Sequence, residues 1–351
     1  MRWPIWMLMI AVSALHAVGG EAPKAEISNG QIRAVIYLPD PQTGFYRSTR
    51  FDWSGVVGSL KYRGHEYYGP WFYKVDPNVR DYSYDDSGVV VSPVSGTVGP
   101  AEEYETDGKG LGYDEAKGGG TFIKIGVGVL RKPLDEAKYD HYRPYEIVNP
   151  GKWTVHKTAA SVEFTQELSD PTTHYGYKYT KVVRLEPGKT QLVIEHAFKN
   201  IGSRAITSSM YNHNFLVLDN QPPGPNLVTK TVYPINPQTS ASEGPGQIRG
   251  SRLIYLKPLQ GKERMTASLA GFGNSASDFD FRVEQRATGA GVRITGDHPL
   301  ANVSVWSIRT VFALEPFVAF TIEPGAETKW TFTYDYYLLP KAGEAGGAAE
   351  K

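Results

Sequence analysis

The sequence predicts an all-β protein made of large antiparallel sheets packed face to face, and three observations support this. Many segments alternate between apolar and polar residues with a period of two, as strands with one buried face do. These segments are rich in Val, Ile, Thr, Tyr and Phe, which half-buried pleated surfaces favour. Beyond the N-terminal segment, no stretch shows the 3.6-residue apolar stripe of an amphipathic helix.

The predicted strands follow one another at the spacing of hairpins, with turn-forming sequences such as Glu-Pro-Gly at 186–188 between them. No repeat of about 40–50 residues with a shared signature occurs, which disfavours a propeller. Long loops at 220–225 and 238–250 are places where binding groups tend to lie on a rigid β scaffold. The strands are predicted at residues 31–38, 121–130, 152–157, 161–167, 176–185, 190–199, 279–286 and 328–337.

The two ends of the chain differ from the rest. Residues 1–20 contain one early charge, Arg2, then an uncharged apolar run and small residues, which is the layout of a secretory signal peptide. An uncleaved N-terminal anchor is the alternative, although the run is shorter than the roughly 20 residues of a membrane span. Residues 21–340 are predicted to form a single β domain, and residues 341–351 a disordered tail.

Composition excludes several classes of function. The chain has 37 Lys and Arg against 37 Asp and Glu, so it lacks the basic surplus of a nucleic-acid-binding protein. It has no cysteine, which excludes thiol catalysis and thiolate metal sites and, in an exported chain, is more usual of a bacterial periplasm. No metal-ligand spacing, nucleotide-binding glycine motif or second long apolar run occurs, so we expect no metal, no cofactor and no integral membrane segment after signal removal.

The first candidate site lies in segment 208–219, SSMYNHNFLVLD. Here three polar residues, Asn212, His213 and Asn214, precede an apolar run. Such a triplet places an imidazole at the end of a sheet or on a concave face, where histidine is a natural proton donor near neutral pH. A turn histidine at a strand edge is the alternative.

The second candidate site lies in segment 311–337, where Glu315 interrupts an otherwise apolar strand between Leu314 and Pro316. A carboxylate in such surroundings is either paired or has a raised pKa, and both are marks of a functional site. The alternative is a side chain that points to solvent beside an edge-strand proline.

Together the two segments resemble the galactose mutarotase-like superfamily, which includes the aldose 1-epimerases. In those enzymes a motif close to Asn-His-x-Tyr-Phe-Asn-Leu carries the catalytic histidine, and Asn212-His213-Asn214-Phe215-Leu216 is similar to it. They also carry a Phe-x-Leu-Glu segment, a Pro-Gly turn and a closing aromatic strand. Residues 312–315, 324–325 and 334–337 are similar in order and spacing. The resemblance implies a large antiparallel β-supersandwich, with Glu315 as the base, His213 as the acid and Asn212 at the substrate.

The chain departs from the aldose 1-epimerase pattern in lacking its Asn-Arg-Ile and His-Gly-Gly segments, whose Arg and His bind the sugar. Glu102 and Glu103 lie roughly where His-Gly-Gly is expected, and they either bind hydroxyls of a different sugar or form a solvated acidic turn. Arg47, Arg50 and Trp53 cluster with Asp52 before a strand, a combination that suits stacking on a sugar and gripping its polar groups. A structural Arg–Asp pair is the alternative for this cluster. His174, followed by aromatic residues, is a further candidate for the same cleft.

These observations predict an exported aldose 1-epimerase-like enzyme that interconverts sugar anomers by His/Glu acid–base catalysis. A non-catalytic carbohydrate-binding protein on the same scaffold is the first alternative, because the two sugar-binding segments are missing and fold does not fix function. A polysaccharide lyase or glycoside hydrolase-related enzyme is the second, because hydrolysis needs two carboxylates and Glu102 and Glu103 are adjacent. In all three cases the ligand is a carbohydrate, and the neutral charge balance favours an uncharged sugar over a phosphorylated one.

Overall fold

The computed structural model describes residues 21–135 and 138–340, so the predicted signal peptide and the predicted disordered tail lie outside the described residues. Strands carry the fold, with two short 3₁₀ helices at Leu218–Asn220 and Ala276–Asp278. The predicted all-β class is therefore confirmed. Within the described ranges, no helix has the length and apolar character needed to cross a membrane.

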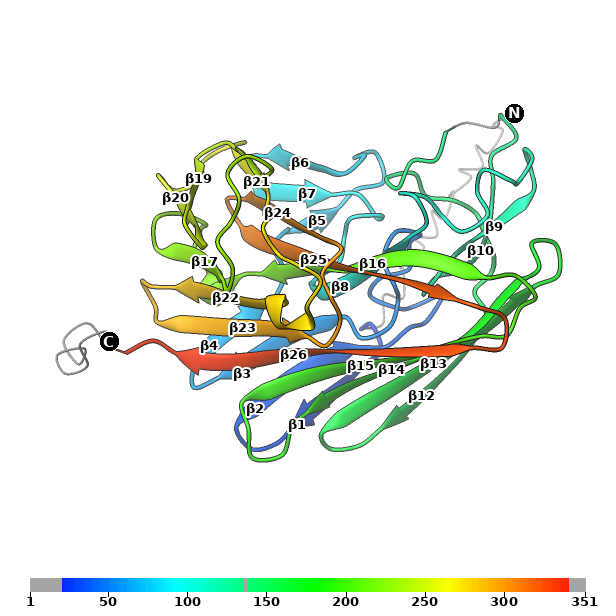
Figure 1. Ribbon diagram of the computed structural model, residues 1–351, viewed down its shortest axis with the longest axis horizontal. Helices are drawn as coiled ribbons and strands as arrows, with labels where there is room; N and C mark the ends of the chain where they lie inside the picture. The colour runs from blue at the N-terminus through cyan, green and yellow to red at the C-terminus, as the bar shows by residue number, and fades with distance from the viewer. Residues whose placement is uncertain (1–20, 136–137, 341–351) are drawn as a thin grey trace, which may run out of the picture.

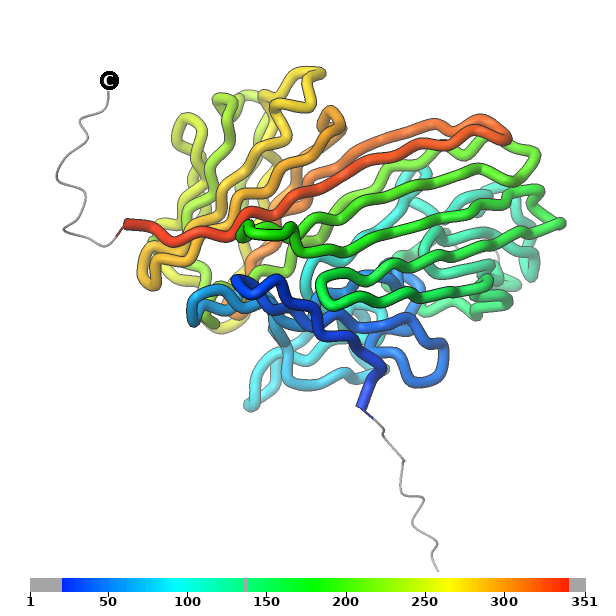
Figure 2. The backbone as a smooth tube through the Cα atoms, turned by 90° about the horizontal axis from the view of Figure 1, so that it is seen from below, coloured from blue at the N-terminus to red at the C-terminus, as the bar shows by residue number. Residues whose placement is uncertain are grey.

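The larger sheet has ten strands and includes six of the predicted ones (Figures 1 and 2). Their spatial order is β12 (Lys152–Lys157), β13 (Ser161–Asp170), β14 (Tyr175–Leu185), β15 (Gln191–Asn200), β26 (Glu327–Leu338), β23 (Ala290–Gly296), β22 (Asp280–Gln285), β17 (Leu227–Thr231), β20 (Arg252–Tyr255) and β19 (Gly246–Arg249). Every neighbouring pair in this sheet is antiparallel. Consecutive strands β12 to β15 are joined as a meander, which agrees with the short turns between them.

The second sheet has six strands and carries both candidate motifs. Its spatial order is β18 (Ala241–Glu243), β21 (Arg264–Ser268), β24 (Asn302–Ile308), β25 (Val311–Ile322), β16 (Ile206–Leu216) and β8 (Gly99–Glu105). His213 lies on β16 and Glu315 on β25, so the two motifs occupy neighbouring strands although about 100 residues separate them in the chain.

Three small sheets complete the described part of the chain. The first contains β1 (Lys24–Ser28), β2 (Ile32–Tyr37), β3 (Val57–Tyr62) and β4 (His65–Tyr68). The second contains β5 (Lys74–Val75), β6 (Tyr82–Asp85) and β7 (Gly88–Val91). The third contains β9 (Thr121–Lys124), β10 (Gly128–Arg131) and β11 (Ile147–Asn149). Here the prediction of one strand at 121–130 was wrong, because the segment is the hairpin β9–β10. Gly126 makes the turn with φ of 78°, and a Cβ there would lie 2.6 Å from the Cβ of Asp52.

The main hydrophobic core lies between the two large sheets. Met210 and Leu314 face it from the six-stranded sheet, and Ile194 and Phe332 face it from the ten-stranded sheet, all fully buried. Because side chains alternate along a strand, the odd-numbered residues of β16 and β25 point to the opposite face of the six-stranded sheet.

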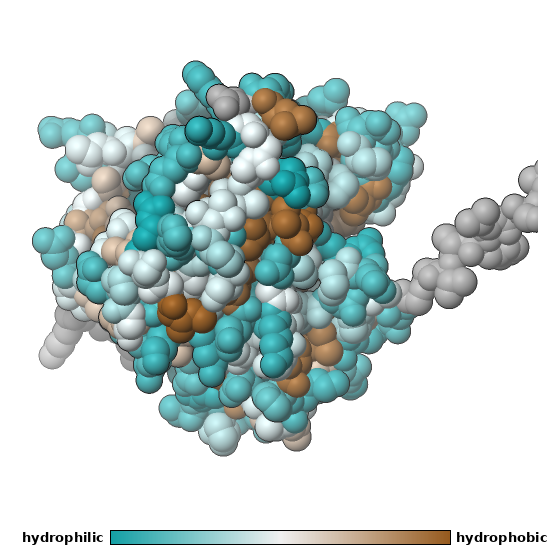
Figure 3. Space-filling model, turned by 90° about the vertical axis from the view of Figure 1, so that its right-hand side faces the viewer, coloured by the Kyte–Doolittle hydropathy of each residue, from teal (hydrophilic) through white to brown (hydrophobic). Residues whose placement is uncertain are grey.

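A second hydrophobic cluster covers part of that opposite face. It joins Phe51 and Val127 from the covering loops to Phe215 and Ile308 of the sheet. The six-stranded sheet is thus buried on both sides, and its outer face is enclosed enough to hold a site. In the end view of Figure 3, the surface is mainly hydrophilic, with hydrophobic groups as separate spots.

Candidate functional site

A cavity of about 490 Å³ lies on the outer face of the six-stranded sheet. All six strands of that sheet contribute lining residues, and loops from the first half of the chain supply the rest. His213, Glu315 and Arg50 are among the lining residues. Much of the remaining wall is aromatic, formed by Trp71, Tyr142, Tyr211, Phe215, Trp306 and Phe317.

Strand register brings the two candidate catalytic residues together. Tyr211 pairs with Phe317 and Asn214 pairs with Leu314, so the same register sets His213 directly opposite Glu315. Directly opposed residues share a face and have neighbouring Cβ atoms. His213 Nε2 and Glu315 Oε1 are 3.1 Å apart, with side chains 7% and 13% exposed. The two side chains therefore face one cavity.

The surroundings push both members of this pair toward their neutral forms. Burial raises the pKa of Glu315 to about 7, and the negative charges of Glu103 and Glu105 add to this while Arg50 opposes it. Glu315, expected either to be paired or to have a raised pKa, thus lies beside His213 with its pKa shifted upward. Burial lowers the pKa of His213 well below its usual value, and Arg50 lowers it further. Near pH 7 the imidazole is therefore neutral and the carboxyl is poised between its two forms.

Aromatic rings hold the imidazole in place. The His213 ring stacks on Phe215 with centroids 3.8 Å apart, and Trp306 meets it edge-on at 5.8 Å. Its Nδ1 atom is buried and has no hydrogen-bond partner among the described residues. The proton of the neutral ring therefore belongs on Nε2, where it can be donated to Glu315 or to a ligand.

Arg50 reaches the cavity wall through a buried charge network. Its Nε donates to Glu103 at 2.7 Å, and Lys124 donates to the other oxygen of the same carboxylate at 2.8 Å. Burial alone would raise the pKa of Glu103, but these two cations lower it below its usual value. Arg50 also donates to the Tyr211 hydroxyl at 3.1 Å. The structural Arg–Asp pair, the alternative for this cluster, is not formed by Arg50, because Arg50 bonds Glu103 and Tyr211 while Asp52 pairs with Lys181.

Glu102 faces the other side of β8 and belongs to a second buried network. It contacts His196 at 2.9 Å and Lys181 at 3.0 Å, both from the ten-stranded sheet. Lys181 also pairs with Asp52 at 3.1 Å. Burial raises the pKa of Glu102, but His196 and Lys181 outweigh it and bring that pKa to about 2.

Adjacent residues of a strand point to opposite faces, so Glu102 and Glu103 cannot flank one bond. Both are at most 1% exposed, both lie outside the cavity lining, and both carboxylates already have cationic partners. The prediction of a solvated acidic turn was therefore wrong, and so was that of direct sugar contacts. The hydrolase alternative depended on these two carboxylates acting together, so it loses its support.

Four other predicted substrate residues lie away from the cavity. Asn212 faces the core side of β16 and is fully buried, because it alternates with His213. Arg47 is exposed and donates to the backbone oxygen of Gln42. Trp53 is buried, and its indole N–H donates to the Ser48 carbonyl at 2.8 Å. His174 is exposed in the turn between β13 and β14, where its φ is 62°. None of the four lines the cavity.

Sequence reasoning missed several lining residues, chiefly Glu105, His141 and the aromatic wall. Glu105 follows Glu103 by two positions on β8 and therefore shares its face, a signal that alternation offered once the strand was recognised. His141 comes from a loop with no partner spacing, so nothing in its local sequence marks it.

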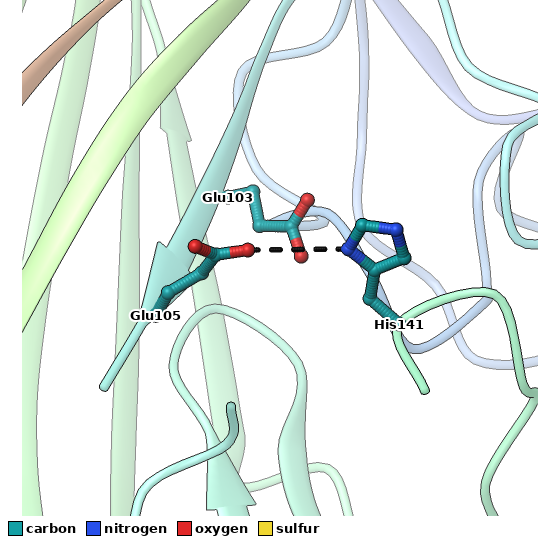
Figure 4. A group of neighbouring side chains, drawn as sticks. All are labelled: Glu103, Glu105 and His141. Atoms are coloured by element: carbon teal, nitrogen blue, oxygen red, sulfur yellow. Dashed lines mark ion pairs between the residues drawn. The ribbon is translucent and has the colours of Figure 1, made fainter. Parts of the chain in front are cut away.

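Glu103, Glu105 and His141 point toward one another with ligand atoms within 4.8 Å, a spacing that a metal ion could bridge (Figure 4). Both oxygens of Glu103 are, however, already bonded to Lys124 and Arg50. A metal ion here would lie beside two buried cations, so this donor set does not suit one.

No protein-family model matches the sequence, and no curated protein matches it. Solved structures do match. A galactose mutarotase-like protein from Lactobacillus casei has a TM-score of 0.51 and 13% identity, covering 90% of this chain and all of that one (100%). A galactose mutarotase related enzyme from Lactobacillus acidophilus has a TM-score of 0.50 and 13% identity, covering 91% and 98%. A galactose mutarotase-like protein from Clostridium acetobutylicum also has a TM-score of 0.50 and 13% identity, covering 90% and 95%.

The chain has the galactose mutarotase-like fold. The β-supersandwich predicted from the two motifs is therefore confirmed as architecture. At this level of identity the galactose mutarotase-like structures establish the fold alone, and the chemistry of the cavity has to be argued from its own residues.

Proposed function

We propose that the protein binds a free sugar in this cavity and interconverts its two anomers by acid–base catalysis. The observation that carries the proposal is the His213–Glu315 pair, 3.1 Å apart on the wall of an aromatic-lined cavity. Solved proteins with the same fold are named galactose mutarotase-like and galactose mutarotase related, which supports the reaction class.

Anomer interconversion requires a proton to leave the anomeric hydroxyl and a proton to reach the ring oxygen. These two oxygens are bonded to the same carbon, so the groups that serve them must be close neighbours, as His213 and Glu315 are. Ionised Glu315 would take the hydroxyl proton and return it to the ring oxygen as the ring opens, while Nε2–H of His213 donates a hydrogen bond to that oxygen. The C1–C2 bond then rotates, and closure reverses both transfers.

The pKa values of the two groups suit this division of labour. A base works best when its pKa lies near the working pH, and the pKa of Glu315 is raised to about 7. The neutral imidazole of His213 keeps its proton on Nε2 and acts as a hydrogen-bond donor to the ring oxygen, because full loss of that proton would leave an imidazolate anion. Aromatic faces such as Trp306 offer stacking surfaces for the apolar face of a sugar ring.

The test follows anomer interconversion by polarimetry or NMR for a panel of freshly dissolved aldoses. Wild type, Glu315→Gln and the exposed-surface control Glu167→Gln should be compared. We expect wild type and the control to accelerate at least one aldose, and Glu315→Gln to lose about 100-fold or more of that rate. Equal rates for wild type and Glu315→Gln on every aldose would refute the proposal.

A non-catalytic carbohydrate-binding protein is the second candidate, and one observation favours it. His213 Nε2 and Glu315 Oε1 already lie 3.1 Å apart, so a sugar has to enter between them before either can act on it. Calorimetry that detects sugar binding, together with no acceleration of any anomer, would select this candidate.

Export of the protein is a further part of the proposal, supported by the signal-like layout of residues 1–20. Expression of the full chain in a bacterium, followed by fractionation and mass spectrometry of the N-terminus, tests it. A chain that begins near residue 21 in the periplasm or medium is expected, and an intact N-terminus in the cytoplasm would contradict export.

A further inference from the structure

Acidic groups outnumber cations around the cavity. Asp81, Glu105 and Glu243 line it in addition to Glu315. Among the described lining residues, Arg50 is the one Lys or Arg, and Glu103 meets its charge at 2.7 Å. Lys124 lies behind the wall, fully buried and paired with the same carboxylate. The charge that a ligand meets is therefore negative.

Glu105 is the acidic group with the fewest competing partners. No hydrogen bond from the described part of the chain reaches its carboxylate, and His141 Nδ1 lies 4.0 Å away, beyond hydrogen-bond distance. Its side chain is 18% exposed and lines the cavity, so it is shielded from much of the solvent yet accessible to a ligand. It is also near enough to Glu315 to raise that residue's pKa.

The other two acids extend this negative surface. Asp81 accepts a hydrogen bond of 2.6 Å from Ser95, itself a lining residue. Glu243 is exposed on β18 at the opposite end of the six-stranded sheet from β8. Glu105 on β8 and Glu243 on β18 line the cavity from opposite edges of the six-stranded sheet, so the negative potential is not confined to one wall.

An anionic ligand would find few compensating groups here. A phosphorylated or carboxylated sugar needs Arg or Lys donors, and the single lining Arg is already committed to Glu103 and Tyr211. A protonated amine would instead meet carboxylate acceptors and the aromatic wall, including Trp306, whose ring attracts cations.

We infer that the cavity selects a sugar that carries a protonated amino group, with Glu105 as the main acceptor of its ammonium. The inference rests on the proposed carbohydrate binding, but it concerns the binding equilibrium and does not depend on turnover. One charge-assisted hydrogen bond at a partly buried site corresponds to about a tenfold or greater gain in affinity.

Calorimetry with matched sugars tests the inference at about pH 6, where an amine is protonated. The probes are glucosamine, N-acetylglucosamine, glucose and glucuronate, together with the same four derivatives of galactose. In one of the two series we expect the amino sugar to bind about tenfold more tightly than its neutral parent. The N-acetyl form, which has lost the charge, should resemble the parent, and the uronate should bind most weakly.

Glu105→Gln provides the matched variant, because it removes the charge and keeps the shape. It should weaken binding of the amino sugar about tenfold more than binding of the neutral parent, whereas the surface control Glu167→Gln should change neither. Asp81→Asn should show the same trend if Glu105→Gln fails to fold, as judged by its unfolding transition.

The inference is overturned if neither amino sugar binds, if neither binds more tightly than its parent, or if a uronate binds best. It is also overturned if both variants leave the preference intact. Tight amino-sugar binding without any anomer interconversion would refute only the proposed catalysis. The proposed function and the inferred selectivity can therefore fail separately.

Discussion

Replacing Glu315 by Gln should stabilise the protein above pH 7, even though it is expected to remove activity. Burial raises the pKa of this carboxyl from 4.5 to about 7. Between those values the folded protein holds a proton that the unfolded chain releases, so the stability of the wild type falls as the pH rises through this window. Glutamine does not titrate and is free of this loss.

The rise in pKa sets the size of the effect. At about 1.36 kcal/mol per pKa unit, a rise from 4.5 to about 7 corresponds to roughly 3 kcal/mol of unfolding free energy. Most of this should develop between about pH 5 and pH 8, since the unfolded carboxyl is already partly ionised at the lower value. The charges that act on Glu315, from Arg50, Glu103 and Glu105, are the same in both proteins, so the comparison isolates the carboxyl at position 315.

Urea unfolding, followed by tryptophan fluorescence at several pH values, measures the difference between wild type and variant. That difference should grow by about 2–3 kcal/mol in favour of Glu315→Gln across the range. Glu167→Gln, on the exposed side of β13, should show no such trend. A difference that stays constant from pH 5 to pH 8 would mean that Glu315 is ionised throughout, and the account of the pair given above would be wrong.

Three further predictions concern the same wall of the molecule. The rate of anomer interconversion should rise about tenfold per pH unit up to about pH 7 and then level off, because ionised Glu315 is the base; a stopped-flow or NMR pH profile that falls over this range would contradict it. Glu103→Gln should lower the unfolding free energy by about 3–5 kcal/mol, because it leaves two buried cations without their carboxylate; urea unfolding at pH 7 that shows a loss below about 1 kcal/mol would contradict it. Trp306→Ala should weaken sugar binding about tenfold in calorimetry, and unchanged affinity would exclude stacking on this ring.

The fold class was accessible from sequence because the period of two is a local property. A strand with one buried face has to alternate, and β12 spans the residues that the pattern predicts. The prediction of a single strand at 121–130 was wrong because the apolar run continues through Gly126 and Gly128, where the chain reverses into β10. Hydrophobicity alone does not distinguish one long strand from a hairpin with an apolar turn.

The site was only partly accessible, because it depends on which distant strands pair. His213 and Glu315 were named from motifs, but their direct contact follows from the register of β16 against β25, which no local pattern specifies. Glu102 and Glu103 were misassigned because charged residues are usually exposed. Their counter-charges, Lys181, His196 and Lys124, come from three other strands and are not visible from the local sequence.

The opposite orientation of Glu102 and Glu103 has a consequence for how the chain finds its fold. β8 is the edge strand beside β16, and a slip of one residue there would exchange the two carboxylates between the faces of the sheet. Each acid is matched to its own set of cations, and the Asp52 N–H also donates to the Glu102 carbonyl at 2.7 Å, so a shifted strand would bury charges without partners. Inward-pointing charges of this kind also make a poor template for another chain's strand. The two acids therefore disfavour both a shifted register of β8 and edge-to-edge association with another chain. They also help to fix the strand register on which the position of His213 depends.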